Sequence, residues 1–317
     1  MSHRYAQSLK VLFSQEPLVP TRRVWPAGVR LAVLAVLLLA VMALAAGVRA
    51  VAGSNPALSL LAGAVVVAGS LIAYAAAVRA MEQRAVVELD PATATSALRT
   101  GSLAGVGLFT ATLVLIAVFG GYGTDGGGSV GGMLAVLGLM TGVAVTEELL
   151  FRGVVFRLLE ELTGTRAAVA VSAPLFGVIH LLNPGATVWG ALAIAVEAGL
   201  MLGAAYAATR NLWLPIGLHL GWNFAGRGIY GAGISGDDTT PVGLVQGVFS
   251  GPEAITGGDF GPEASIFAVL VCAVPTILFL RAAKRRGRLY TRGQLRAGTE
   301  TSTASSTASS ADSSTDS

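Results

Sequence analysis

Long apolar stretches rich in Ala, Val, Leu, Ile and Gly recur along the chain, separated by shorter polar segments. Most have the roughly 17–25 residues that an α-helix needs to cross the hydrocarbon core of a membrane. They predict about eight transmembrane helices, at residues 31–48, 57–78, 103–122, 134–158, 167–183, 187–209, 212–230 and 264–283. The predicted fold class is therefore all-α, a polytopic membrane protein.

Composition supports this prediction, and the placement of charge adds an orientation. Of the 317 residues, 53% are hydrophobic and 12% are charged, whereas about a quarter of a soluble domain is charged. The net charge of +3 could indicate a nucleic-acid partner, but most Lys and Arg residues fall in segments on one side of the predicted membrane. Only Arg49 and Arg227 fall on the other side, so the positive-inside rule predicts that both termini are cytoplasmic. We expect a protein of the cell membrane with the lipid bilayer as its surroundings, and no nucleic acid as a partner.

The same pattern predicts the organisation of the chain. A basic cytoplasmic segment (1–30) precedes three helices (31–122), a core (130–230), an outer loop (231–263), a last helix (264–283) and a cytoplasmic tail (284–317) that ends in a disordered Ser/Thr run. Ala50-Val51-Ala52 resembles a signal-peptide cleavage site, but about 30 residues precede the first apolar stretch, which favours a retained helix. The outer loop is acidic and rich in glycine, which predicts a flexible connector, with a lid as the alternative.

Three further features predict structure rather than chemistry. Cys272 is the single cysteine, so no intramolecular disulfide can form, and a small packing residue is the preferred interpretation. Residues 79–100 carry both signs of charge and are expected to form a solvated loop. Gly121–Gly126 matches the nucleotide-binding pattern G-x-G-x-x-G, but it follows a helix rather than a strand, so no nucleotide site is predicted.

Ionisable side chains are rare within the predicted helices, and their positions are the main indication of function. They are Glu147, Glu148, Arg152, His180, Glu197 and His219. A charge at the centre of a transmembrane helix costs about 2.5–3.5 kcal/mol, so such groups must pair, become neutral or line a wet cavity. Two histidines and a free carboxylate on three helices therefore indicate a functional site.

Helical spacing separates the two glutamates. Glu148 and Arg152 are i and i+4 residues, which predicts an ion pair on one helix face. Glu147 is turned away by about 100° and is left free for chemistry. His219 and Asn223 share the same i, i+4 spacing, so their side chains are expected to reach one place.

Three short motifs carry a resemblance to a known family. Glu147–Arg152 reads E-E-x-x-x-R, Phe176–His180 reads F-x-x-x-H and His219–Asn223 reads H-x-x-x-N. In this order, on three membrane helices, they resemble the CPBP family of intramembrane proteases, which includes CAAX prenyl protease 2, Abi and lysostaphin-resistance-protein-A-like proteins. The resemblance covers roughly residues 130–225 and makes 130–230 the expected catalytic core.

The resemblance implies roles for these residues. Glu147 with His180 would activate a water molecule, and His219 with Asn223 would stabilise the oxyanion, while Glu148 and Arg152 would hold Glu147 in place. Phe176 belongs to the supporting residues. A second version uses zinc, with Glu147, His180 and His219 as ligands and Glu148 as the base. The chain has no H-E-x-x-H motif and no third membrane histidine, which favours the metal-free version, but the cofactor stays open between none and zinc.

The expected function is that of an intramembrane endopeptidase acting on membrane-associated protein or peptide substrates. One alternative is a proteolytically silent chaperone or scaffold of the same family. Another is a proton-coupled transporter, which the absence of an evident internal repeat disfavours. No feature of the sequence indicates recognition of a prenyl group. Glu197 belongs to none of the motifs, and it either borders the same cavity or is a protonated structural residue.

Overall fold

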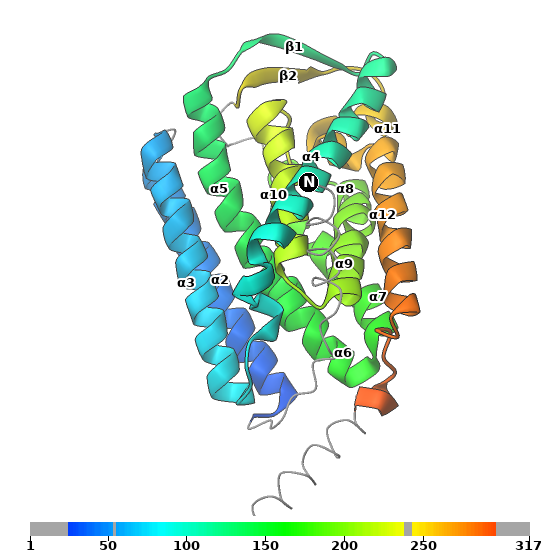
Figure 1. Ribbon diagram of the computed structural model, residues 1–317. Coiled ribbons are helices and arrows are strands. Elements are labelled where there is room, and N and C mark those ends of the chain that lie inside the picture. The colour runs from blue at the N-terminus through cyan, green and yellow to red at the C-terminus, as the bar shows by residue number, and fades with distance from the viewer. Residues whose placement is uncertain (1–24, 53–54, 238–242, 296–317) are drawn as a thin grey trace, which may run out of the picture.

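The chain folds into a bundle of helices that stand side by side (Figure 1). This computed structural model describes residues 25–52, 55–237 and 243–295. Most of the predicted basic segment (1–24) and the predicted disordered end of the tail (297–317) lie outside the described residues.

Six helices of the described chain are long and apolar enough to cross a membrane. They are α3 (Pro56–Glu82), α4 (Pro91–Val118), α5 (Val130–Glu148) continued by η2 (Leu149–Phe156) and α6 (Arg157–Thr163), α7 (Thr165–Ile179) continued by η3 (His180–Leu182), α8 (Val188–Ile194) continued by η4 (Ala195–Leu200) and α9 (Met201–Thr209), and α12 (Ile266–Arg285). The protein is thus a multi-pass, helical membrane protein, as predicted.

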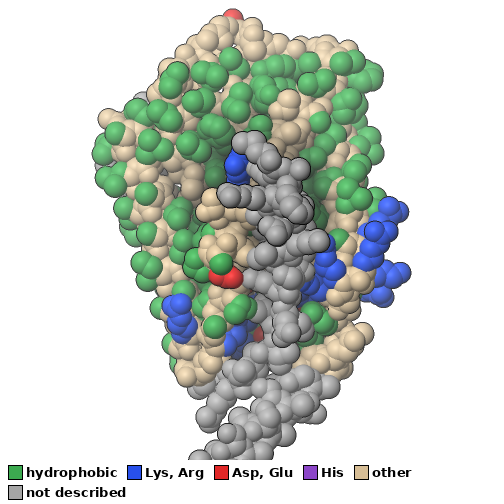
Figure 2. Space-filling model, in the orientation of Figure 1, with side chains coloured by type: hydrophobic (Ala, Val, Ile, Leu, Met, Phe, Trp, Pro, Cys, Tyr) green, Lys and Arg blue, Asp and Glu red, His purple; other side chains and the backbone are tan. Residues whose placement is uncertain are grey.

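Two further apolar helices correspond to the other predicted spans. They are α2 (Ala27–Ala52) and α10 (Trp213–Asn223), the latter continued by η5 (Phe224–Ile229). The total of eight spans stays a prediction. Much of the face seen in Figure 2 is hydrophobic, as contact with lipid requires, and most of the Lys and Arg side chains visible there lie in its lower half.

One predicted helix start was wrong, and the expected loops contain an element that was not predicted. α4 begins at Pro91 rather than at residue 103, because Asp90 caps it by accepting a hydrogen bond from the backbone N–H of Ala92 at 3.0 Å, and proline suits the first helical turn. The expected outer loops also contain a small antiparallel sheet of β1 (Tyr122–Gly127) and β2 (Val245–Phe249), which joins segments far apart in the sequence (Figure 1).

The expected solvated loop at residues 79–100 is in fact part of a buried ion-pair network. Glu82 is fully buried and binds Arg157 at 2.6 and 2.7 Å and Arg30 at 3.0 Å. Glu88, in the 3-10 turn η1 (Val87–Leu89), binds Arg84 at 2.7 and 2.8 Å. Burial opposes ionisation of Glu88, but the hydrogen bonds and charge of Arg84 outweigh it and lower the pKa of the carboxyl. The network joins α2, α3 and α6 at one end of the bundle.

Glycines allow α4 and α10 to pack with their backbones in contact. A Cβ atom added to Gly105 would lie 2.2 Å from the carbonyl oxygen of Leu218, and one added to Gly221 would lie 2.1 Å from that of Ser102. Gly101 and Gly217 meet the facing backbone in the same way. Small residues spaced four apart on both helices permit this approach, which fixes α10 against its neighbour.

Candidate active site

The two adjacent glutamates end α5, and a π-helical segment, η2, begins directly after them. π-Helical turns are rare and often occur at functional sites. The Glu148 side chain is fully buried, whereas that of Glu147 is 14% exposed. The two carboxyl groups therefore have different surroundings, in agreement with the division expected from helical spacing.

Arg152 ties Glu148 to a neighbouring helix. Its Nη1 donates a hydrogen bond to Oε1 of Glu148 at 2.8 Å, which is the ion pair predicted from the spacing. Its Nη2 donates to the carbonyl oxygens of Ala198 and Gly199 at 3.1 and 3.2 Å. The guanidinium also lies 4.6 Å from the centre of the Phe176 ring, a cation–π contact. Arg152 thus connects η2 with η4 and α7.

His219 lies between the two glutamates. Its Nδ1 is 3.0 Å from Oε1 of Glu148, within hydrogen-bonding distance, and its Nε2 is 3.9 Å from Oε2 of Glu147. The structure thus brings together Glu147, Glu148, Arg152 and His219 from two helices. Buried Oε2 atoms of both glutamates have no hydrogen-bond partner among the described residues, so each keeps an unused acceptor.

His180 is oriented by the backbone of its own helix. Its Nδ1 is 2.7 Å from the carbonyl oxygen of Phe176. Because a carbonyl oxygen can only accept, Nδ1 must carry the proton, and Nε2 of the neutral ring has a free lone pair. The Phe176 ring packs against the rings of both histidines, with centres 4.9 Å from His180 and 6.1 Å from His219.

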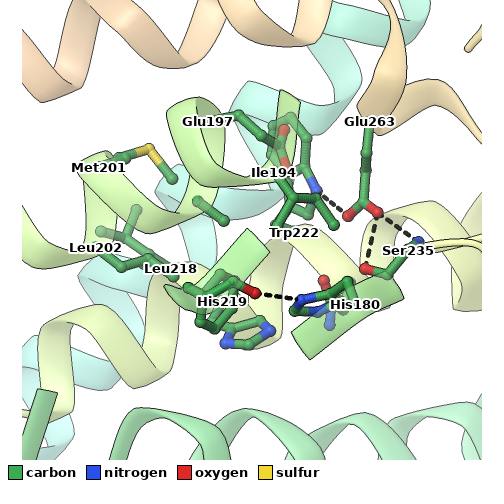
Figure 3. A pocket seen from close by; sticks show the side chains of 13 residues that line it. His180, Ile194, Glu197, Met201, Leu202, Leu218, His219, Trp222, Ser235 and Glu263 are labelled. Carbon is green, nitrogen blue, oxygen red and sulfur yellow. Dashed lines mark hydrogen bonds between the residues drawn. The ribbon is translucent and has the colours of Figure 1, made fainter. Parts of the chain in front are cut away.

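A small pocket lies beside these histidines (Figure 3). His180, His219 and Asn223 all line it, so the structure brings three of the four expected catalytic side chains to one cavity. The space open to the centre of a water molecule is about 20 Å³, enough for one water. Glu147 is not among the lining residues and reaches this group through its proximity to His219.

Two further lining residues, Ser235 and Glu263, come from the expected outer loop and were not among the predicted site residues. Glu263, in η7 (Pro262–Ala264), accepts hydrogen bonds from Nε1 of Trp222 at 2.7 Å and from the N–H and hydroxyl of Ser235 at 2.5 and 2.9 Å (Figure 3). Glu263 is 2% exposed, so at least this part of the loop is folded into the protein. Burial raises the pKa of its carboxyl group, although the three donors act in the opposite direction.

The only signal for Glu263 in the sequence was an acidic residue in a segment without Lys or Arg. Glu197, for which the sequence leaves two interpretations open, borders the cavity. Cys272 is buried, as expected for a packing residue, and its sulfur lies 4.0 Å from Oε2 of Glu197.

Comparison with known proteins connects this geometry to a family. Residues 129–225 match the model of type II CAAX prenyl endopeptidase Rce1-like domains. This part of the chain is an Rce1-like domain. The match confirms the resemblance to CAAX proteases drawn from the three motifs, and all the motif residues lie within it. No curated protein and no solved structure matches the chain significantly.

The side chains of the Rce1-like domain do not fit zinc as they are arranged. Within the described ranges, no three His, Cys, Asp or Glu side chains gather as metal ligands would. Nδ1 of His219 is engaged by Glu148 and Nδ1 of His180 by a backbone carbonyl, which would leave the Nε2 atoms to bind a metal. In the described residues these two rings and Glu147 do not converge on one point as a ligand set must. We therefore derive no step through a metal.

Proposed function

We propose that the protein is an intramembrane endopeptidase that hydrolyses peptide bonds of membrane-associated proteins or peptides with a water molecule activated by Glu147 and His180. The observation that carries the proposal is that the two glutamates differ in their contacts. Glu148 binds Arg152 and His219, while Oε2 of Glu147 is buried without a hydrogen-bond partner in the described chain. The Rce1-like domain supports it, since that family is one of proteases.

In the proposed reaction, the oxygen of water attacks the carbonyl carbon of the scissile peptide bond. Glu147 takes a proton from the water, assisted by the free lone pair on Nε2 of His180. When the tetrahedral intermediate collapses, the C–N bond breaks and the same proton passes to the leaving amine. Peptide hydrolysis is thereby balanced, with water as the only co-reactant.

The negative oxygen of the intermediate would receive hydrogen bonds from His219 and Asn223, in which His219 must donate from Nε2. Since Nδ1 of His219 faces Glu148, this role requires a ring that carries protons on both nitrogens, or a protonated Glu148 that donates to Nδ1. Carboxylates near both nitrogens of His219 support the first arrangement.

The test is cleavage by purified protein in liposomes, with internally quenched peptides as substrates, one farnesylated and ending in C-a-a-X and one a membrane-spanning peptide without a prenyl group. Glu147→Gln and His180→Ala should each lower kcat by about 10²–10⁴-fold, the usual contribution of general acid–base catalysis. Glu253→Gln, an exposed glutamate of the 231–263 loop, is the matched control and should cleave like the wild type.

Two results would contradict the proposal. Cleavage by Glu147→Gln or His180→Ala at the wild-type rate would remove the substituted residue from the chemistry and contradict the proposed activation of water. Stoichiometric zinc in the purified protein, lost in His219→Ala, would replace the metal-free mechanism with the zinc version. For natural substrates, a comparison of membrane-protein termini between cells with the wild type and cells with Glu147→Ala would identify the cleaved proteins.

A further inference from the structure

Glu197 is a buried carboxyl group in the same pocket that the proposed reaction does not use. It is 1% exposed and lies in the π-helical segment η4. Its Oε1 has no hydrogen-bond partner in the described part of the chain, and its Oε2 has only the weak donor Cys272 at 4.0 Å. A buried polar atom without a partner is unfavourable and rare in folded proteins, so it requires an explanation.

Glu263 shows that this pocket can satisfy a carboxyl group fully. Both of its oxygens accept hydrogen bonds, from Trp222 and from Ser235, while Glu197 in the same pocket has no such donors (Figure 3). The incomplete bonding therefore belongs to Glu197 itself and not to the pocket as a whole, which Glu197 and Glu263 both line.

The surroundings of Glu197 favour a neutral carboxyl group. Within the described ranges no Lys or Arg forms an ion pair with it, and the guanidinium of Arg152, which binds the carbonyls of the next two residues, Ala198 and Gly199, is engaged by Glu148. A second carboxyl group, Glu263, lines the same pocket. A neutral carboxyl group offers one donor and one acceptor, which complements the N–H and C=O groups of a peptide main chain rather than a cation.

We propose that Glu197 is a substrate-binding residue of this site, which hydrogen-bonds through its neutral carboxyl group to the main chain of the peptide entering the pocket beside His180 and His219. The inference rests on the proposed endopeptidase function. The three hydrogen bonds of Arg152 provide its link to the motif residues, since they hold the turn that follows Glu197 at a fixed distance from Glu148. In the free protein the cavity has room for one water molecule, which the peptide group would displace.

Two substitutions of nearly equal size test this role by steady-state cleavage of the same two quenched peptides in liposomes. Glu197→Gln keeps one donor group and one acceptor and should retain a KM within about twofold of the wild type. Glu197→Leu has neither and should raise KM roughly five- to tenfold with kcat little changed, as expected for the loss of a hydrogen bond that contributes to binding. Its melting temperature should not fall, because leucine removes an unsatisfied polar group from the interior; Glu197→Met replaces it if the leucine variant does not fold.

Every other pattern overturns the inference. A wild-type KM in both variants would make Glu197 a packing residue. An equally impaired KM or kcat in both variants would mean that a carboxylate charge or a transferable proton is required. Binding of the same peptides to Glu147→Gln protein, followed by fluorescence anisotropy, separates this inference from the proposed function. If the wild type cleaves nothing, the endopeptidase proposal fails, and equal peptide affinity with and without Glu197→Leu in that background then refutes the binding role by itself.

Discussion

At the scale of single residues, the neighbouring glutamates should respond differently to substitution. Arg152 is buried and is the cationic partner of Glu148, so Arg152→Ala would leave a buried carboxylate without its ion pair, a change that typically costs about 3–5 kcal/mol of stability. We expect a marked fall in melting temperature together with loss of cleavage. Glu147→Gln should lose cleavage at nearly unchanged melting temperature, because Oε2 of Glu147 has no hydrogen bond to lose within the described chain. Differential scanning fluorimetry of both variants in detergent tests this contrast, and equal melting temperatures would contradict it.

The sequence predicted the Glu148–Arg152 ion pair because both residues lie on one helix, where distance follows from spacing alone. It could not predict that Nδ1 of His219 faces Glu148, since that contact depends on how α5 and α10 pack. Glu263 was beyond prediction for a similar reason: its loop returns to the pocket through contacts with Trp222 and Ser235, and no periodic pattern encodes such a return.

At the scale of elements, the contact between α4 and α10 should control the position of His219. Gly105→Ala would place a methyl group 2.2 Å from the carbonyl oxygen of Leu218, the residue before His219, so α10 must move. Overpacking of this kind costs about 1–3 kcal/mol, and a displacement of about 1 Å at a catalytic group can cost 10²-fold in rate. We expect lower thermal stability and at least tenfold lower kcat/KM.

Gly107→Ala is the matched control, since it lies on the same helix and an added Cβ has no atom within 4 Å. It should leave stability and cleavage close to wild type. Equal losses in the two variants would contradict the role of the contact with α10, since alanine raises helix propensity at both positions and cannot itself cause a loss.

Among elements, the long apolar helices were predictable from composition, but their ends and irregularities were not. The start of α4 depends on the cap at Asp90, which the apolar pattern alone does not reveal. The π-helical segments η2, η4 and η5 adjoin Glu148, contain Glu197 and follow Asn223, respectively. A π-helical turn contains one residue more than an α-helical turn, and this difference cannot be detected in a pattern of apolar positions. The location of the three π-helical segments around the site is therefore seen only in the three-dimensional structure.

At the scale of the whole molecule, the loops that the charge pattern assigned to one side of the membrane do meet at one end of the bundle. Thr165 donates its backbone N–H to the carbonyl of Tyr290, and Leu212 donates to that of Glu88. At the opposite end, Ser250 donates to the carbonyl of Gly121. This grouping fits an even number of spans with both termini on one side, while the side itself stays a prediction from the positive-inside rule.

Cysteine labelling decides the orientation, because Cys272 is the only cysteine of the chain and is buried. In a Cys272→Ala background, Ser250→Cys and Thr291→Cys each add one thiol at an exposed position, at opposite ends of the bundle. A membrane-impermeant maleimide should label Ser250→Cys in intact cells, and Thr291→Cys only after the membrane is permeabilised. The reverse pattern would place the basic end outside, and labelling of both or neither in intact cells would contradict a fixed orientation. Since η7 and Glu263 belong to the same loop as Ser250, the predicted result also means that Glu263 reaches the pocket from the outer side.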